Sequence, residues 1–360
     1  KTKTTTTTTT KTTTNLNIEK KFIFFQNLNI NKIAEFNPDL IICPFLTKKI
    51  PKEIYSKYLC LIIHPGIKGD RGPNSIDWLI LNKQKIGGVT ILQAEEKMDG
   101  GDIWATGEFK INPEKNLKKS TIYNKYVVKL ASELVIISLK NFLDKNFLPI
   151  KQTKENSIVI FEHKILTRNS PERNIDFFKD STNEILWKIN AADTQPGVKG
   201  NIFIKNLNFE IKKFLYGAVK ENLKIFEKNF EYFNGNFQSF FNKINFGEIF
   251  LRKNEAVCIK TIDGAIWIQY MRDLKTEENP NEFKLPALLN LRKHKNVGFI
   301  IDEEIKEIFE DKNFKDNEYN NNNNNNTEID IETFNEIKFE SFYYNDNACI
   351  TIMEFNFYNG

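Results

Sequence analysis

Short apolar runs alternate with polar, turn-rich stretches along residues 16–150, and this pattern predicts strands joined by helices. Strands are expected at residues 21–25, 41–45, 59–63 and 88–93, and short helices at residues 30–36 and 74–82. A longer helix is expected over residues 121–143, starting at Ser120, with one buried face formed by Ile122, Val127, Leu130, Leu134 and Ile137. The alternation of strands with helices indicates an α/β fold.

The pattern changes beyond residue 157. After a helix expected at residues 183–192, the chain carries short β-type runs at residues 201–204, 210–215, 249–251, 256–261 and 266–270. Turn signals such as Asp263-Gly264 separate these runs. They predict a small β-rich, OB-like barrel domain.

Low-complexity segments divide the rest of the chain. The Thr-rich residues 1–15 offer almost nothing to bury, so a disordered tail is expected there. Residues 292–330 are charged and contain an Asn tract, which is typical of a linker. The predicted domains are therefore residues 16–150 and 157–291, and a third, very short β-rich piece follows at residues 331–360.

Composition narrows the possible partners. The 51 basic and 47 acidic residues are spread evenly, so no nucleic-acid-binding face is expected. No apolar run approaches the roughly 20 residues that span a bilayer. The four cysteines (Cys43, Cys60, Cys258 and Cys349) lie far apart without metal-ligand spacing, and they are interpreted as buried thiols of a reducing compartment. We therefore expect a cytoplasmic protein that binds neither a metal nor a membrane.

One histidine occupies a position that suggests chemistry. His64 ends the apolar run 59–63 and opens the turn sequence HPGIKGDRGP. A strand that ends at a titratable ring places that ring at the carboxyl edge of a sheet, where open α/β sheets bind ligands. Asp99 follows the strand expected at residues 88–93, so His64 and Asp99 are predicted to meet at two strand ends as an acid/base pair. The alternative for Asp99 is a turn residue before Gly100, and Asp102 is expected to be structural.

These segments resemble a known family. The HPGIKGDRGP turn, with GVTILQA at residues 88–94 and MDGGDIWA at residues 98–105, is similar to the formyltransferase domain of HypX-type hydrogenase maturation proteins. The likeness continues at residues 191–198, 263–268 and 283–287, and FNFYNG at residues 355–360 resembles the start of that family's crotonase-like domain. It implies a Rossmann-like formyltransferase domain followed by the β-rich barrel domain and by a truncated crotonase-like domain at residues 331–360.

The resemblance also implies an enzyme activity. Members of the family take a formyl unit from 10-formyltetrahydrofolate, and here His64 would be the proton shuttle with Asp99 as its partner. In the family, the crotonase-like module decarbonylates a formyl-CoA intermediate to supply carbon monoxide to a hydrogenase metal centre. Coenzyme A is therefore a possible acceptor, although its site belongs to the module that is expected to be missing. The expected function is formyl transfer or hydrolysis of the formyl-folate.

Two departures from the family pattern are visible. Folate formyltransferases usually carry an asparagine two residues before the catalytic histidine, where its amide stabilises the oxyanion, and Ile62 occupies that position here. Losing such a donor costs about 10²- to 10³-fold in rate, so either Asn74 or a backbone N–H near Gly66 replaces it, or turnover is slow. The family's first strand is expected to be absent, because residues 21–25 match its second strand.

Other candidate contacts are less specific. The loop that begins at Phe45 corresponds to the family's pterin-holding loop, so Phe45, Leu46 and Ile50 are expected either to contact substrate or to be ordinary core residues. Arg71 is expected to contact an anion or to cap the turn. His163 and His294 lie in polar stretches and are expected at the surface.

Two other functions are compatible with the sequence. Ile62 and the two incomplete ends favour a catalytically inactive remnant that binds folate or is purely structural. Formylation of an initiator tRNA, as in methionyl-tRNA formyltransferase, would use the same two domains, but the balanced charge disfavours it because tRNA binding depends on basic faces. The sequence does not identify a protein partner.

Overall fold

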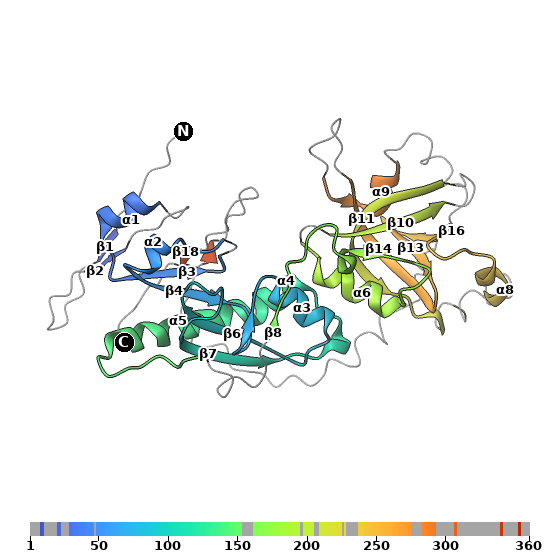
Figure 1. Cartoon of the computed structure of the whole chain (residues 1–360). Coiled ribbons are helices and arrows are strands. Elements are labelled where there is room, and N and C mark those ends of the chain that lie inside the picture. The colour runs from blue at the N-terminus through green and yellow to red at the C-terminus, as the bar shows by residue number, and fades with distance from the viewer. Residues whose placement is uncertain are drawn as a thin grey trace.

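A computed structural model shows a small α/β unit followed by a larger β-rich unit (Figure 1). The structure describes residues 8–10, 20–22, 29–46, 48–152, 161–194, 197–204, 209–224, 227, 237–274, 283–292, 306–307, 339–340 and 352–353. The expectations for His294, Cys349 and the Asn tract concern residues outside these ranges.

The first unit is built on a four-stranded mixed sheet. Its strands lie in the order β3 (Leu40–Pro44), β4 (Leu59–His64), β6 (Ile86–Gln93) and β7 (Ile103–Lys110). The β3–β4 pair is parallel, whereas the β4–β6 and β6–β7 pairs are antiparallel. The strands expected at residues 41–45, 59–63 and 88–93 are confirmed, and so is the α/β class.

Side chains of β4 alternate between two apolar clusters. Leu61 and Ile63 pack in the cluster that contains Leu134, whereas Cys60 packs with Ile33 on the opposite face of the sheet. The short helices α1 (Ile30–Phe36), α2 (Lys52–Tyr55) and α3 (Ser75–Leu81) supply further residues to these clusters. Because strand side chains alternate, His64 shares the face of Cys60.

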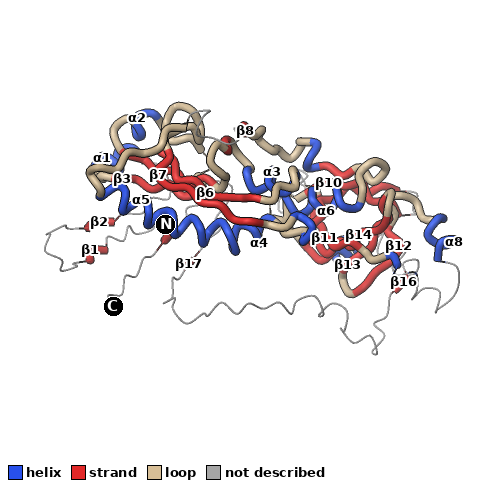
Figure 2. Tube along the Cα trace, turned by 90° about the horizontal axis from the view of Figure 1, so that it is seen from below, coloured by secondary structure: helices blue, strands red, loops and turns tan. Residues whose placement is uncertain are grey.

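The long helix contains a π-helical segment. It consists of α4 (Lys119–Ile122), η2 (Tyr123–Val127, π-helical) and α5 (Val128–Leu143), and Figure 2 shows α5 running along the sheet. The prediction that Ile137 is buried is wrong, since it is 45% exposed. The buried face of α5 passes through Ala131, Leu134, Val135 and Ser138, so the residue that follows Leu134 on this face is Ser138, four positions on, and not Ile137.

The second unit combines one long sheet with helix α6 (Thr182–Ala191). Its main strands are β10 (Val198–Ile204), β11 (Phe209–Lys220), β12 (Ile249–Lys253), β13 (Ala256–Thr261) and β14 (Gly264–Asp273). Shorter elements complete it: β9 (Asn174–Ile175), α8 (Phe237–Asn242), β15 (Leu285–Pro286), α9 (Ala287–Arg292) and β16 (Lys306–Glu307). All five β-type runs predicted from the sequence are confirmed.

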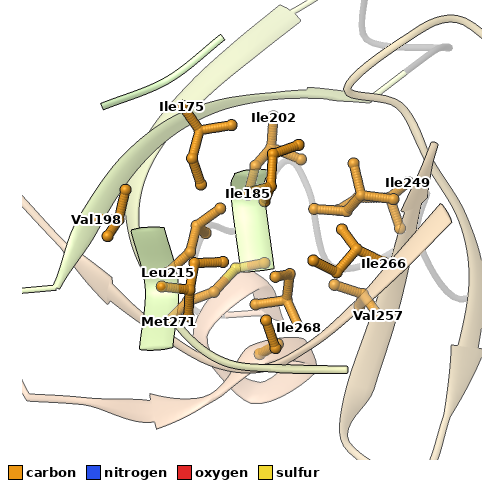
Figure 3. Packing of buried hydrophobic residues seen from close by; sticks show 14 of the residues in the cluster. Ile175, Ile185, Val198, Ile202, Leu215, Ile249, Val257, Ile266, Ile268 and Met271 are labelled. Carbon is orange, nitrogen blue, oxygen red and sulfur yellow. The ribbon is translucent and has the colours of Figure 1, made fainter. Parts of the chain in front are cut away.

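The sheet of the second unit surrounds an apolar core. Ile185 of α6 lies among side chains from the strands, including Ile202, Ile266 and Met271 (Figure 3). The strand order β16-β12-β13-β14-β11-β10-β9 is open, and a single parallel bridge, Phe203 to Glu248, links β10 to the approach of β12. The β-rich character is therefore confirmed, but the described strands do not form the closed barrel that the sequence suggested.

The ends of the chain differ from the sequence-based expectation. β1 (Thr8–Thr10) lies in the expected disordered tail and pairs antiparallel with β2 (Lys20–Phe22), which is not a strand of the four-stranded sheet. In the expected linker, β16 pairs with β12. The short strands β17 (Phe339–Glu340) and β18 (Ile352–Met353) pair with each other near the end of the chain.

Buried polar contacts join the two units. Asp77 of α3 accepts a hydrogen bond from Arg173, which follows the first unit in the chain, and Asp77 Oδ1 also lies 2.5 Å from Lys119 Nζ. The N-terminus of α4 is capped from the second unit, because the Ser120 N–H and hydroxyl both donate to Asp193. Ser120 therefore lies at the start of the helix as predicted, and its capping partner is distant in sequence.

Candidate active site

His64 is the last residue of β4, and its ring lies between two carboxylates. Nε2 is 3.1 Å from Asp70 Oδ1, and Nδ1 is 3.5 Å from Asp99 Oδ2. The hydroxyl of Ser75, the first residue of α3, lies 3.3 Å from the same Nε2. Only 4% of His64 is exposed, so its proton equilibria depend on these neighbours rather than on bulk water.

Asp70 is the central group of the site. Its Oδ1 faces His64 and accepts a hydrogen bond of 3.1 Å from the Ser75 hydroxyl, and its Oδ2 lies 3.0 Å from His163 Nε2. Asp70 belongs to β5 (Asp70–Arg71), which pairs with β8 (Phe161–Glu162) and so brings His163 into the site. The prediction that His163 lies at the surface is wrong, because its side chain is only 7% exposed.

Asp99 reaches His64 by a different route from the one expected. β6 is antiparallel to β4, so its carboxyl end at Gln93 lies beside Leu61 and not at the His64 edge. The loop of residues 94–102 turns back over about 10 Å, the length of three strand residues, and brings Asp99 to the ring. Asp99 adopts a left-handed conformation with φ of 51°, which aspartate tolerates better than most residues. The two predicted residues do meet, although their strand ends do not.

Close backbone packing holds the turn that contains Gly66 against the His64 ring. A Cβ atom on Gly66 would lie 2.5 Å from His64 Nε2 and 2.7 Å from Asp70 Cγ, so only glycine fits there. The Thr90 hydroxyl donates to the Gly66 carbonyl at 2.9 Å and ties the turn to β6. The His64 ring and the Asp70 carboxylate are thus held in contact by the backbone of the turn.

Hydrogen bonds with Gly72 and Gln152 hold the loop that carries Asp99. The Gly72 N–H donates to Asp99 Oδ2 at 3.0 Å. Gln152 donates to the carbonyls of Asp99 and Gly101 at 2.9 and 3.0 Å, and its own amide oxygen accepts a bond of 3.3 Å from Arg71. Arg71, predicted to contact an anion or to cap the turn, is therefore buried and linked to the loop that carries Asp99.

The charges of the site favour an imidazolium between carboxylates. Burial lowers the pKa of His64, but the hydrogen bond that it donates to Asp70 and the charges of Asp99 and Asp70 raise it, and the net direction is upward. Burial raises the pKa of Asp70, but the hydrogen bonds to His163 and His64 lower it below its usual range. A protonated His64 next to ionised Asp70 is therefore the favoured state, and it can donate a proton.

The other residues predicted to contact substrate differ in how deeply they are buried. Ile50 is 3% exposed and belongs to a core cluster, and Leu46 packs against that cluster. Phe45 is half-buried with φ of 50° and contacts Tyr123 edge to face. Of the three, Phe45 and Leu46 keep part of their surface available to a ligand.

Asn74, the side chain proposed to replace the missing asparagine, is already engaged in other hydrogen bonds. Ile62 packs against the cluster that contains Cys60. The Asn74 amide is occupied elsewhere, because its oxygen accepts from the Leu166 N–H at 2.9 Å and its nitrogen donates to Asp77 at 3.2 Å. The side-chain hydroxyl of Ser75 lies next to the His64 ring instead, 3.3 Å from Nε2.

Sequence reasoning missed three residues of this centre: Asp70, Ser75 and His163. Asp70 lies in the turn six residues after His64, and an acid in such a turn is a signal that could have been used. Ser75 follows at the start of α3. For His163, 93 residues away from Asp70, no local pattern gave a signal.

Comparisons with known proteins identify the family that this chain resembles. Residues 4–136 match the model of the formyl transferase family. The chain carries a formyl transferase domain. In the crystal structure of HypX from Aquifex aeolicus with tetrahydrofolic acid, the alignment has 33% identity and a TM-score of 0.59, and it covers 87% of this chain and 45% of HypX. The resemblance to HypX-type proteins and the Rossmann-like formyltransferase fold are thus confirmed.

Curated relatives include a hydrogenase maturation factor and methionyl-tRNA formyltransferases. The hydrogenase maturation factor HoxX of Bradyrhizobium diazoefficiens is 29% identical over 258 residues, which are 71% of this chain and 39% of HoxX. A methionyl-tRNA formyltransferase of Malacoplasma penetrans is 29% identical over 214 residues, which are 58% of this chain and 63% of that enzyme. The chain therefore spans less than two thirds of the length of each of these relatives.

Metal-binding clusters and membrane-spanning helices are both absent from the described residues. No group of three or more His, Cys, Asp or Glu side chains in the described ranges is arranged to hold a metal ion. Among the helices in the same ranges, none has the length and apolar character required to cross a membrane.

Proposed function

We propose that this protein takes the formyl group of 10-formyltetrahydrofolate and transfers it to an acceptor, with His64 and Asp99 as the reacting pair. The observation that carries the proposal is the buried His64 ring held between the Asp70 and Asp99 carboxylates. The folate complex of HypX supports the choice of donor, since that relative aligns with 87% of this chain.

The arrangement supplies the proton movements that formyl transfer requires. An acceptor nucleophile attacks the formyl carbon, its proton passes to Asp99, and the carbonyl electrons move to oxygen. When the carbonyl re-forms, the bond to N10 of the folate breaks, and that nitrogen takes a proton from the His64 imidazolium. General acid–base catalysis of this kind contributes about 10²- to 10⁴-fold to a rate.

The described residues fit the reacting end of such a donor. Donor and acceptor would reach the ring on the Asp99 side, where the contact of 3.5 Å is longer than a hydrogen bond, while the Nε2 side is closed by Asp70 and by the backbone of Gly66. The partly exposed Phe45 and Leu46 are the residues that we propose for contact with the flat pterin ring.

Turnover of the folate is the direct test. Purified protein is mixed with 10-formyltetrahydrofolate, and release of tetrahydrofolate is followed in wild type, His64→Ala and Asp99→Asn. Both variants are expected to lose at least about 10²-fold in rate. Asp102→Asn is the matched control, because Asp102 lies in the same turn and is predicted to be structural. Equal rates in wild type and His64→Ala would sink the proposal.

The acceptor is identified by the product. Free formate indicates hydrolysis, and a formyl thioester formed when coenzyme A is added indicates transfer to a thiol. The likeness to the hydrogenase maturation factor HoxX supports a role in hydrogenase maturation. Binding of tetrahydrofolate without any turnover would instead support the catalytically inactive remnant.

The likeness to methionyl-tRNA formyltransferase supports a second candidate, formylation of an initiator tRNA. The balance of 51 basic and 47 acidic residues argues against it. Binding to tRNA that weakens steeply between about 50 and 200 mM salt would favour this candidate over transfer to a thiol.

We also propose the cytoplasm as the compartment, since Cys43, Cys60 and Cys258 are buried free thiols. The proposed domain limits remain residues 16–150 and 157–291, and limited proteolysis tests them. Cleavage is expected first between residues 150 and 157 or beyond residue 291. Early cuts inside either range would contradict the limits.

A further inference from the structure

His163 enters the site from a segment that follows the long helix. Its backbone N–H donates to the Arg71 carbonyl at 2.8 Å, which extends the pairing of β8 with β5. Its ring is stacked between Trp78 and Phe161, with centroid distances of 5.9 and 6.0 Å and an interplanar angle of 9° in each case. The ring is thus held at a fixed height and angle, and Nε2 lies 3.0 Å from Asp70 Oδ2.

One carboxylate therefore connects two imidazole rings. Asp70 presents Oδ1 to His64 and Oδ2 to His163, and 5% of the Asp70 side chain is exposed. Without His163, Oδ2 would be a buried carboxylate oxygen that lacks its donor, and a carboxylate with one lost donor is a stronger proton acceptor at its other oxygen. The hydrogen bond from His163 to Oδ2 therefore affects how strongly Oδ1 of Asp70 attracts the proton of His64.

We propose that His163 is a positioning residue of the formyl-transfer site: by donating to Asp70 Oδ2 it orients this carboxylate and limits the negative charge that Asp70 presents to His64. The inference rests on the proposed function for its catalytic meaning. The contact between His163 and Asp70 can be tested without turnover.

The other charged groups near these rings are few among the described residues. His64 faces Asp70 from β5 and Asp99 from the loop 94–102, and Asp70 faces the two histidines. The Arg71 guanidinium contacts Gln152. Of the interactions that keep the pKa of Asp70 low, the hydrogen bond to His163 is the largest.

The test compares two substitutions of His163. His163→Phe keeps an aromatic ring between Trp78 and Phe161 but removes the donor, whereas His163→Gln keeps a neutral N–H donor of similar reach. Glu162→Gln is the matched control, because this neighbouring side chain is exposed and faces away from the site. Each protein is labelled with ¹⁵N-histidine, and the ring signals are titrated by NMR. Since the chain has only three histidines, His64 can be assigned with the His64→Gln variant.

We expect the titration midpoint of His64 to rise in His163→Phe by roughly half to one pH unit, the shift that the loss of one hydrogen bond supports. His163→Gln and Glu162→Gln are expected to stay close to wild type. In turnover of 10-formyltetrahydrofolate, His163→Phe should lower kcat several-fold, leave KM nearly unchanged and move the pH profile in the same direction.

An unchanged His64 midpoint in folded His163→Phe would overturn the inference. So would a His163→Gln protein that behaves like His163→Phe, because the ring and not the donor would then be what matters. If the His64 midpoint rises in His163→Phe as expected but the wild type shows no turnover, the proposed function fails while the link from His163 to His64 stands.

Discussion

Arg173 and Asp77 form an ion pair that is almost completely excluded from water, with side-chain exposures of 1% and 0%. Asp77 belongs to α3 of the first unit, and Arg173 immediately precedes β9 of the second. Arg173 also donates to the Ala191 carbonyl at the end of α6. A single guanidinium therefore holds α3 and α6 together, and α3 begins with Ser75 of the site.

Removing this guanidinium should destabilise the protein. Arg173→Met leaves the buried Asp77 with Lys119 as its remaining cation, and we expect a loss of about 3 kcal/mol in the free energy of unfolding. Urea unfolding measures the loss. Lys179→Met is the matched control, because its ion pair with Asp176 is largely exposed and should contribute little. Similar losses of unfolding free energy in Arg173→Met and Lys179→Met would show that the buried ion pair contributes no more to stability than the exposed one.

Gly66→Ala should disable the site directly. The added methyl would lie 2.5 Å from His64 Nε2, so the ring must move away from Asp70, and turnover is expected to fall at least tenfold with a destabilisation of about 1–3 kcal/mol. Gly100→Ala is the control, since its Cβ would meet only the flexible Lys97 side chain at 3.0 Å. A Gly66→Ala protein with wild-type turnover would contradict the geometry of the turn.

The His64–Asp70 pair should make stability depend on pH in both directions. The pKa of Asp70 is lowered on folding, so its contribution is complete above the ordinary value of 3.8 and is lost as the pH falls through the folded pKa. The pKa of His64 is raised, so its contribution is complete below 6.5 and is lost as the pH rises through the folded pKa. Both contributions are present together between these two values.

Thermal unfolding between about pH 5 and 9 checks the upper side of this window. The midpoint of the wild type should fall more steeply above pH 6.5 than that of His64→Gln, which lacks the ionising ring. Parallel curves for the two proteins would mean that His64 gains no charge-dependent stabilisation on folding.

The buried thiols should be inert in the folded protein. Burial raises the pKa of Cys43 and of Cys60 to about 12 each, with the neighbouring thiol adding to the shift at Cys43. At pH 8 only about one thiol in 10⁴ would be ionised, so iodoacetamide should leave both unmodified until the protein is unfolded in guanidinium. Mass spectrometry of the peptides measures this, and rapid labelling of native Cys43 would refute it.

Elements that depend on local sequence were predictable. The strand ending at His64 and the helix bounds near residues 74–82 and 183–192 follow from short-range apolar spacing and turn residues, and the structure reproduces them. The π-helical segment before α5 was not predictable in this way. The exposure of Ile137 was not predictable either, because a step of three residues from Leu134 to Ile137 and a step of four to Ser138 are both helical spacings, and it is Ser138 that is buried.

The site was predictable in part, because half of it depends on long-range pairing. The meeting of His64 with Asp99 was predicted from two strand ends, but the direction of β6 is decided by pairing with β4 and β7 and leaves no local signal. The position of His163 depends on the β5–β8 pair, which joins residues more than 90 positions apart. Contacts of this kind are invisible to a local apolar pattern.

His64 and Asp99 are held by different kinds of structure, a strand and a loop. His64 is the last residue of β4 and pairs with Thr90 of β6. Asp99 lies in the nine-residue loop 94–102, which is held mainly by hydrogen bonds with Gly72 and Gln152. The position of the imidazole is therefore set by the sheet, whereas the position of its carboxylate partner depends on a loop and on a glutamine that lies beyond the long helix.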